Sequence, residues 1–154
     1  MKGLDSLVPD FTRSLDALPG ASEAWRQLDA SLSGPSFLPA RAGAIISVVV
    51  AERVGDDYAR WAVHRLAERA GVNGEARMLA AAGTSLDPCM RAVVKAAWLM
   101  VSCERLPQAL ECPAPHAMLL GERGAAVLTA RVAMALLACR VLQAVAPKVH
   151  AAAP

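Results

Sequence analysis

Apolar residues recur at intervals of three and four along most of this chain, and short links rich in glycine and proline separate the stretches in which they do so. This spacing is that of amphipathic helices. It predicts helices at about residues 22–34, 42–54, 57–70, 74–83, 88–107 and 121–146. No stretch alternates apolar and polar residues as a half-buried strand does. The pattern therefore predicts an all-α fold with short connections.

The stretch at residues 42–51 leaves two interpretations open, because every position except Ser47 is apolar. Its β-branched residues, Ile45, Ile46 and Val48 to Val50, suit a buried strand. Periodicity does not separate a buried strand from a buried helix in so short a run. We favour a helix, because the neighbouring segments are helical and no partner strand is visible.

Residues with capping chemistry mark the expected helix ends. Ser22 is expected to cap the helix at residues 22–34. Asp56 or Asp57 is expected to cap the helix at residues 57–70, and Gly71 to close it in the C′ position. These ends divide the chain into an N-terminal helical arm at 1–36, a helical domain at 37–146 and a loose tail at 147–154.

The helix at residues 57–70 separates two kinds of side chain. At 100° per residue, one side carries Ala59, Ala62, Val63, Leu66 and Ala70, and the other carries Asp57, Arg60, Trp61, His64 and Glu68. The charged and titratable side chains of this helix therefore share a single face. An ordinary solvated face with ion pairs one turn apart has the same composition, so the pattern alone does not make it a site.

Composition suggests a chain that buries surface against other subunits. Of its 154 residues, 55% are hydrophobic, whereas soluble domains average about 45 to 50% hydrophobic residues. Only 19% are charged, whereas about a quarter is usual. A net charge of +2 with no basic cluster argues against a nucleic-acid partner. The first residues lack a signal-peptide pattern, so we expect a cytoplasmic protein.

The apolar segment near the C-terminus is long enough to raise the question of a membrane span. Arg131 and Arg140 interrupt it, and a charge at the centre of a spanning helix costs about 2.5 to 3.5 kcal/mol. We therefore expect no membrane partner and interpret the segment as a buried or subunit-facing helix.

Cysteine spacing does not indicate a metal centre. Cys89, Cys103, Cys112 and Cys139 form no C-x-x-C pair, and zinc sites use closely spaced ligands. In a reducing compartment we expect free thiols that behave mainly as small apolar side chains. G-x-G-x-x-G, P-loop, G-x-S-x-G and H-E-x-x-H motifs are also absent.

Three stretches, in order, resemble the carboxymuconolactone decarboxylase family, which includes the alkylhydroperoxidase D-like proteins. They are FLPARAGAIISVVVAERVGDDY, then DYARWAVHRLAERAGVNGEARMLAAAGTSLDP, and then LLGERGAAVLTARVAMALLACRVLQAV, and together they cover about residues 37–145. The resemblance implies an alkylhydroperoxidase D-like helical bundle that is an obligate homodimer, trimer or hexamer. It also implies that the helix bearing His64 lines a pocket near a subunit boundary.

The peroxidase branch of that family carries C-x-x-C-x-x-x-H on this helix and a glutamate on the preceding one. Counting back from His64, the two cysteine positions fall on Asp57 and Arg60. Counting from the Leu-Pro opening, the glutamate position falls on Ala44, so only His64 survives. Thiol peroxidase chemistry needs a thiolate and a resolving thiol, and we do not expect it here.

The resemblance to the decarboxylase branch, which works without a cofactor, implies a different use of the same face. His64 is the candidate acid or base, since an imidazole ordinarily titrates near pH 6.5. Arg60 stands where that branch usually has glutamate and is a candidate anchor for a substrate carboxylate, with Trp61 and Asp57 beside it. Glu52 is the one acid that can approach from the preceding helix, but helix-end solvation is the interpretation we favour for it.

Two other functions remain open at this stage. A catalytically degenerate member of the family would persist as an oligomeric binding or scaffold protein. A less favoured alternative keeps antioxidant peroxidase activity through cysteines outside the usual positions, Cys89 and Cys103.

Overall fold

The computed structural model describes residues 14–33, 38, 41–102 and 115–145, with the backbone alone for 115–120. Its helices are α2 (Ala21–Leu32), α3 (Ala42–Val54), α4 (Asp57–Arg69), α5 (Gly74–Ala81), α6 (Pro88–Ser102) and α8 (Pro115–Val145). Within these ranges there is no strand, so the all-α prediction is confirmed. The tail at 147–154 and residues 103–107 of the predicted 88–107 helix lie outside the described residues.

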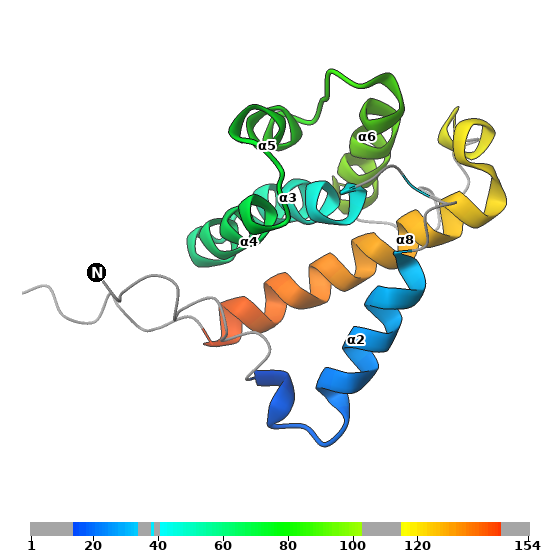
Figure 1. The fold of residues 1–154 in the computed structure, drawn as a ribbon. Coiled ribbons are helices and arrows are strands. Elements are labelled where there is room, and N and C mark those ends of the chain that lie inside the picture. Colours follow the sequence, from blue (N-terminus) through cyan, green and yellow to red (C-terminus); the bar gives the residue numbers. More distant parts are fainter. Residues whose placement is uncertain (1–13, 34–37, 39–40, 103–114, 146–154) are drawn as a thin grey trace, which may run out of the picture.

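The helix α3 forms the centre of the molecule. It contacts α4, α5, α6 and α8, which surround it in Figure 1. Ile46 and Val48 to Val50 have no exposed surface, and Ala51 is buried with them. The apolar run is therefore a helix, as expected, because a helix enclosed by others buries β-branched side chains on every side and needs no partner strand.

The ends of α4 follow the predicted chemistry. The carboxylate of Asp56 accepts a hydrogen bond from the backbone N–H of Ala59 at 2.8 Å. Gly71 has a φ of 81°, and the N–H groups of Gly71 and Val72 bond to the carbonyls of Glu68 and Ala67. This pair of bonds is the Schellman arrangement, which favours glycine at C′. Asp56, not Asp57, is therefore the cap.

The expected cap of α2 is wrong. The helix begins at Ala21, after Gly20 in a left-handed conformation (φ 79°), and has no side-chain cap. The N-cap therefore lies at Gly20, two residues before the expected Ser22. Ser22 consequently lies inside the first turn, where its hydroxyl donates to Asp16 instead.

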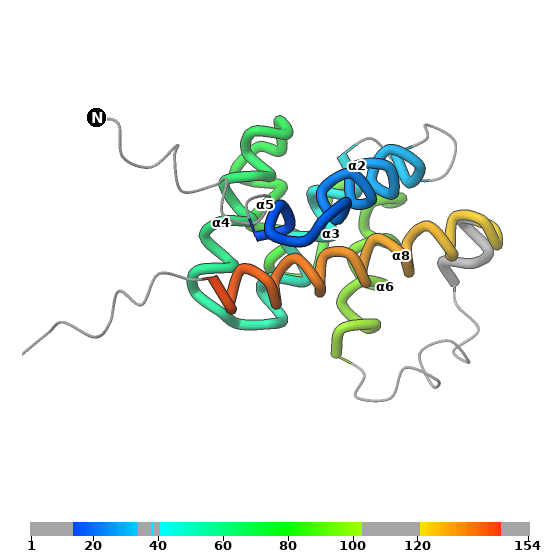
Figure 2. Tube along the Cα trace, turned by 90° about the horizontal axis from the view of Figure 1, so that it is seen from below, coloured from blue at the N-terminus to red at the C-terminus, as the bar shows by residue number. Residues whose placement is uncertain are grey.

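The helix α8 crosses the whole molecule (Figures 1 and 2). Gly121, with φ 68° and ψ 175°, breaks the helical geometry, so the first turns point away from the long segment that follows. Among the described residues, Gly121–Val145 is long and apolar enough to cross a membrane by length and composition. A core helix of a soluble protein passes the same test, and α8 packs against α3 and α6.

The helix α2 is attached differently from the others. None of its residues is fully buried, and it leans against α8 at one side of the molecule (Figure 1). Asp29 of α2 forms an ion pair with Arg131 of α8, whose side chain is only 12% exposed. Arg131 also donates to the carbonyl of Asp29 at 3.1 Å and to the hydroxyl of Ser33 at 2.7 Å. A polar contact to α8 therefore adds to the packing of the partly buried Ala21 and Trp25 against the core in holding this arm.

Candidate functional site

The tight connection between α3 and α4 places the candidate residues of both helices together. Only Gly55, with a φ of 76°, and Asp56 separate the two helices. The last turn of α3 consequently lies beside the first two turns of α4. Glu52, Arg60 and His64 meet there.

Glu52 contacts both of the other residues through different oxygens. Its Oε1 lies 2.9 Å from Nε2 of His64, and its Oε2 lies 3.7 Å from a terminal nitrogen of Arg60. The Glu52 side chain is 22% exposed and that of His64 is 28% exposed. A carboxylate only accepts hydrogen bonds, so this contact holds the Nε2 proton of the ring. Nδ1 is then the ring nitrogen that the contact with Glu52 leaves unused.

The solvated helix end expected for Glu52 is therefore wrong. The side chain turns inward along the α3–α4 contact rather than outward from the last turn of α3. A sequence signal did exist: Glu52 and His64 flank the Gly55–Asp56 turn, and two helices joined by so short a turn must lie side by side. The direction of the side chain depends on the helix rotation, which packing decides.

Arg60 is held by acids on two sides. It forms an ion pair with Asp57 one turn earlier on α4 and the longer contact with Glu52. The hydrogen bond to Asp57, followed by the charges of Asp57 and Glu52, raises the pKa of Arg60 above its ordinary value. Arg60 is therefore a permanent cation beside the His64 ring. Asp57 itself is 91% exposed and contacts Arg60 rather than His64.

The aromatic member of the predicted site faces the core. Trp61 is partly buried against the hydrophobic core, and its ring stacks on Tyr58 with centroids 5.9 Å apart and planes at 29°. The stack stiffens the first turns of α4. Trp61 therefore packs between α4 and the core and helps to hold α4 in place.

A residue that the sequence did not indicate also reaches His64. Arg77 of α5 donates to the backbone carbonyl of His64 at 3.0 Å and lies 3.6 Å from Glu68. Its Nε is buried and has no hydrogen-bond partner in the described part of the chain. Arg77 therefore ties α5 to the turn of α4 that carries the imidazole.

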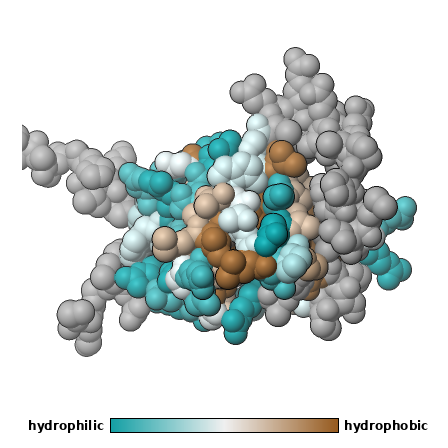
Figure 3. Space-filling model, turned by 90° about the horizontal axis from the view of Figure 1, so that it is seen from above, coloured by the Kyte–Doolittle hydropathy of each residue, from teal (hydrophilic) through white to brown (hydrophobic). Residues whose placement is uncertain are grey.

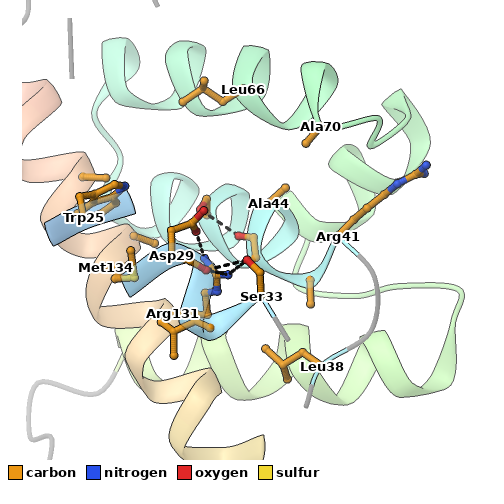
Figure 4. A pocket seen from close by; sticks show the side chains of 16 residues that line it. Trp25, Asp29, Ser33, Leu38, Arg41, Ala44, Leu66, Ala70, Arg131 and Met134 are labelled. Carbon is orange, nitrogen blue, oxygen red and sulfur yellow. Dashed lines mark hydrogen bonds and ion pairs between the residues drawn. The ribbon is translucent and has the colours of Figure 1, made fainter. Parts of the chain in front are cut away.

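Elsewhere, the described residues line a half-open cavity of about 680 Å³ between α2, α3, α4 and α8, which we call the α2 cavity (Figure 4). Leu66 and Ala70 of α4 line it, and Asp57, Arg60, Trp61 and His64 do not. Of the five residues predicted on the apolar side of this helix, Ala59, Ala62 and Val63 are buried, whereas Leu66 is 41% exposed. Ala67 occupies the core in its place.

The described cysteines differ in environment. Cys139 has no exposed surface, and burial raises the pKa of its thiol to about 11. Cys89 is exposed at the start of α6. Cys103 and Cys112 lie outside the described residues. No group of three or more histidine, cysteine, aspartate or glutamate side chains in the described ranges is arranged to hold a metal ion.

Comparison with models of protein families, with curated proteins and with solved structures finds no match to this chain.

Proposed function

We propose that the chain is a carboxymuconolactone decarboxylase-like enzyme that uses acid/base chemistry, without a cofactor, on a small carboxylated metabolite. The observation that supports this most is the 2.9 Å contact between Glu52 and His64, with the Arg60 cation beside it. The family assignment itself rests on the three sequence stretches. A homo-oligomer in the cytoplasm is part of the same proposal.

The chemistry asked of these residues is limited to moving one proton and holding one charge. In decarboxylation, the bond between the ring carbon and the carboxylate carbon breaks, carbon dioxide leaves, and the electron pair stays on the ring system. A proton must then be delivered to carbon. Nδ1 of His64 delivers it, while the contact with Glu52 fixes the orientation of the ring.

Arg60 can accept a substrate carboxylate because its present partner is exchangeable. Asp57 is almost fully exposed, and ion pairs between exposed side chains contribute about 0 to 1 kcal/mol. A substrate carboxylate that binds the guanidinium with two parallel hydrogen bonds competes favourably with such a pair. Binding would leave the contact between Arg60 and Glu52 in place.

The direct test uses 4-carboxymuconolactone as the probe and measures release of carbon dioxide. We expect turnover by the wild type, and a loss of roughly 100-fold or more in kcat for His64→Gln, the range typical of a lost general acid or base. Glu52→Gln should reduce kcat less, because the imidazole remains. Arg60→Gln should mainly raise KM.

Arg65 offers a matched control for Arg60. It lies on the same helix, has similar exposure and pairs with Glu68 at 3.0 Å, away from the Glu52–His64 pair. Arg65→Gln should retain wild-type kinetics. Full activity in His64→Gln would disprove the proposed role of the imidazole.

A catalytically degenerate scaffold is the second candidate, and two observations favour it. Arg60 already has acidic partners, and the α2 cavity does not include His64. This candidate predicts no turnover of carboxylated lactones by any variant. Peroxidase activity has less support, because Asp57 and Arg60 occupy the thiol positions and Cys139 is buried with a raised pKa.

A further inference from the structure

The walls of the α2 cavity are those of a ligand site. Small residues on three helices make the room, among them Ala44 of α3, Ala70 of α4 and Ala138 of α8. Larger apolar side chains, Leu38, Leu66 and Met134, complete the wall (Figure 4). A volume of about 680 Å³ falls in the range of about 300 to 1,000 Å³ that is usual for small-molecule sites.

Two opposite charges inside the cavity form an ion pair, whereas a third charged residue of the lining has no ion-pair partner among the described residues. Arg131 and Asp29 face each other within the cavity and form an ion pair (Figure 4). Arg41 also lines the cavity, and among the described residues it forms no ion pair. The described lining residues therefore carry one uncompensated positive charge, from two arginines and one aspartate.

The backbone of Arg41 has an unusual conformation. Arg41 precedes α3 with a φ of 65°, and no other non-glycine residue in the described part of the chain has a positive φ. Its guanidinium lies over Gly71 at the end of α4, where a Cβ atom on Gly71 would come within 3.3 Å of it. The arginine thus spans from the start of α3 to the end of α4, and its charged end points outward, away from the other labelled side chains of the cavity (Figure 4).

We propose that the α2 cavity binds a small organic monoanion, with its carboxylate on Arg41 at the rim and its apolar body against the alanines and Met134 inside. This site is separate from the Glu52–His64 pair. Leu66 and Ala70 lie two and six residues after His64, which places them about 200° and 240° around α4 from it. The two sites therefore occupy opposite faces of one helix, and neither depends on the activity of the other.

The experiment is a calorimetric titration of the full chain with 1-naphthoate and with its neutral analogue 1-naphthalenemethanol. We expect one equivalent of naphthoate to bind, at least tenfold more tightly than the alcohol. Arg41→Gln should remove this difference. Ala44→Leu and Ala138→Leu, which fill the cavity from two helices, should each weaken naphthoate binding tenfold or more.

Two variants outside the cavity serve as controls. Arg65→Gln removes an exposed arginine from α4, and Leu99→Ala removes an exposed apolar side chain from α6. Both should bind naphthoate as the wild type does. The comparison of acid with alcohol uses the wild-type protein, so the test stands even if a variant does not fold.

Three results would overturn the proposal. They are an absence of naphthoate binding at millimolar concentration, equal affinity for acid and alcohol, and unchanged binding by folded cavity-filling variants. His64→Gln separates this site from the proposed catalytic one. Naphthoate binding that disappears in His64→Gln but persists in Ala44→Leu would place the carboxylate at the Glu52–His64 pair instead.

Discussion

Burial determines what each described cysteine can do. The Cys139 thiol has no exposed surface, and removal of water from around the thiolate raises its pKa from 9.0 to about 11. Its contribution to stability is present below the pKa of the unfolded thiol. It is lost as pH rises from about 9 to about 11, because the unfolded chain releases the proton first.

The resulting prediction concerns stability at alkaline pH. Two pKa units correspond to about 3 kcal/mol, so the free energy of unfolding should fall between pH 9 and pH 11 by up to that amount through this one thiol. Urea unfolding of the wild type and of Cys139→Ala at pH 7, 9, 10 and 11 measures it. The variant should be less stable at pH 7 but should lose less on the way to pH 11. Parallel curves would show that the thiol is not buried as described.

Part of the candidate site could be predicted from the sequence. Helical periodicity puts Arg60 and His64 on one face of α4, and the structure brings them together around Glu52. The contacts of Glu52 and Arg77 arise between helices, so their positions depend on how α3 and α5 are rotated about their axes. That rotation is set by packing of the whole core, which a local pattern does not contain.

At the scale of single elements, two adjacent aspartates have different roles: one caps α4, and the other carries an exposed charge. Asp56 bonds to the N–H of Ala59, whereas Asp57 is in the first turn and 91% exposed. We expect Asp56→Ala to cost about 1 kcal/mol of stability, as lost caps do. Asp57→Ala should cost only a few tenths, because it loses an exposed ion pair. Thermal unfolding of both variants measures the difference, and equal losses would contradict Asp56 as the cap.

The attachment of α2 to α8 gives a second prediction at this scale. Arg131→Met keeps an unbranched apolar stem but removes the guanidinium, which lies beside Gly43, together with its ion pair to Asp29 and its bond to Ser33. We expect a loss of about 1 kcal/mol in the attachment, which corresponds to roughly fivefold faster amide exchange in α2. Hydrogen exchange resolved by mass spectrometry measures this, with α3 as the internal reference.

The control for that experiment lies on the same helix. Arg140 is exposed on α8 and bonds to Gln143, within its own element. Arg140→Met should leave exchange in α2 unchanged. Unchanged exchange in Arg131→Met as well would mean that apolar contacts, such as those of Trp25, hold the arm.

Element positions were predictable because each depends on local chemistry. The helical nature of α3 and the end of α4 at Gly71 follow from the sequence. Ser22 fits a cap by its residue type, but the left-handed turn at Gly20 starts the helix earlier. Leu66 fits the apolar stripe of α4, yet it lies at a cavity, since a stripe shows only which residues share a side.

At the scale of the whole molecule, some large apolar side chains lie on the surface rather than in the core. Large apolar side chains remain exposed on several elements, namely Leu18, Leu28, Leu66, Met78, Leu86, Leu99 and Leu137. Figure 3 shows apolar side chains gathered near the centre of one face, surrounded by polar ones. In α8, only 33% of the most apolar window is buried within the chain. We propose that another subunit or lipid covers the rest of this helix.

The position of Arg131 favours a subunit as the cover. A spanning α8 would carry the Arg131–Asp29 ion pair, and with it part of the polar helix α2, into the bilayer. We therefore expect a stable oligomer without detergent, with a mass at least twice the 16.1 kDa of one chain. Light scattering after size-exclusion chromatography measures it.

Leu137 tests which surface forms the contact. It is 52% exposed on α8, so Leu137→Lys should leave the fold intact and shift the protein toward the mass of one chain. Leu86→Lys adds the same charge at an exposed position before α6 and should keep the oligomer. A charge on a surface that packs against a partner must be desolvated, whereas a charge facing water need not be, and this difference separates the two variants. A wild type with the mass of one chain, or one that floats with lipid vesicles, would contradict the assignment of α8 to a subunit contact.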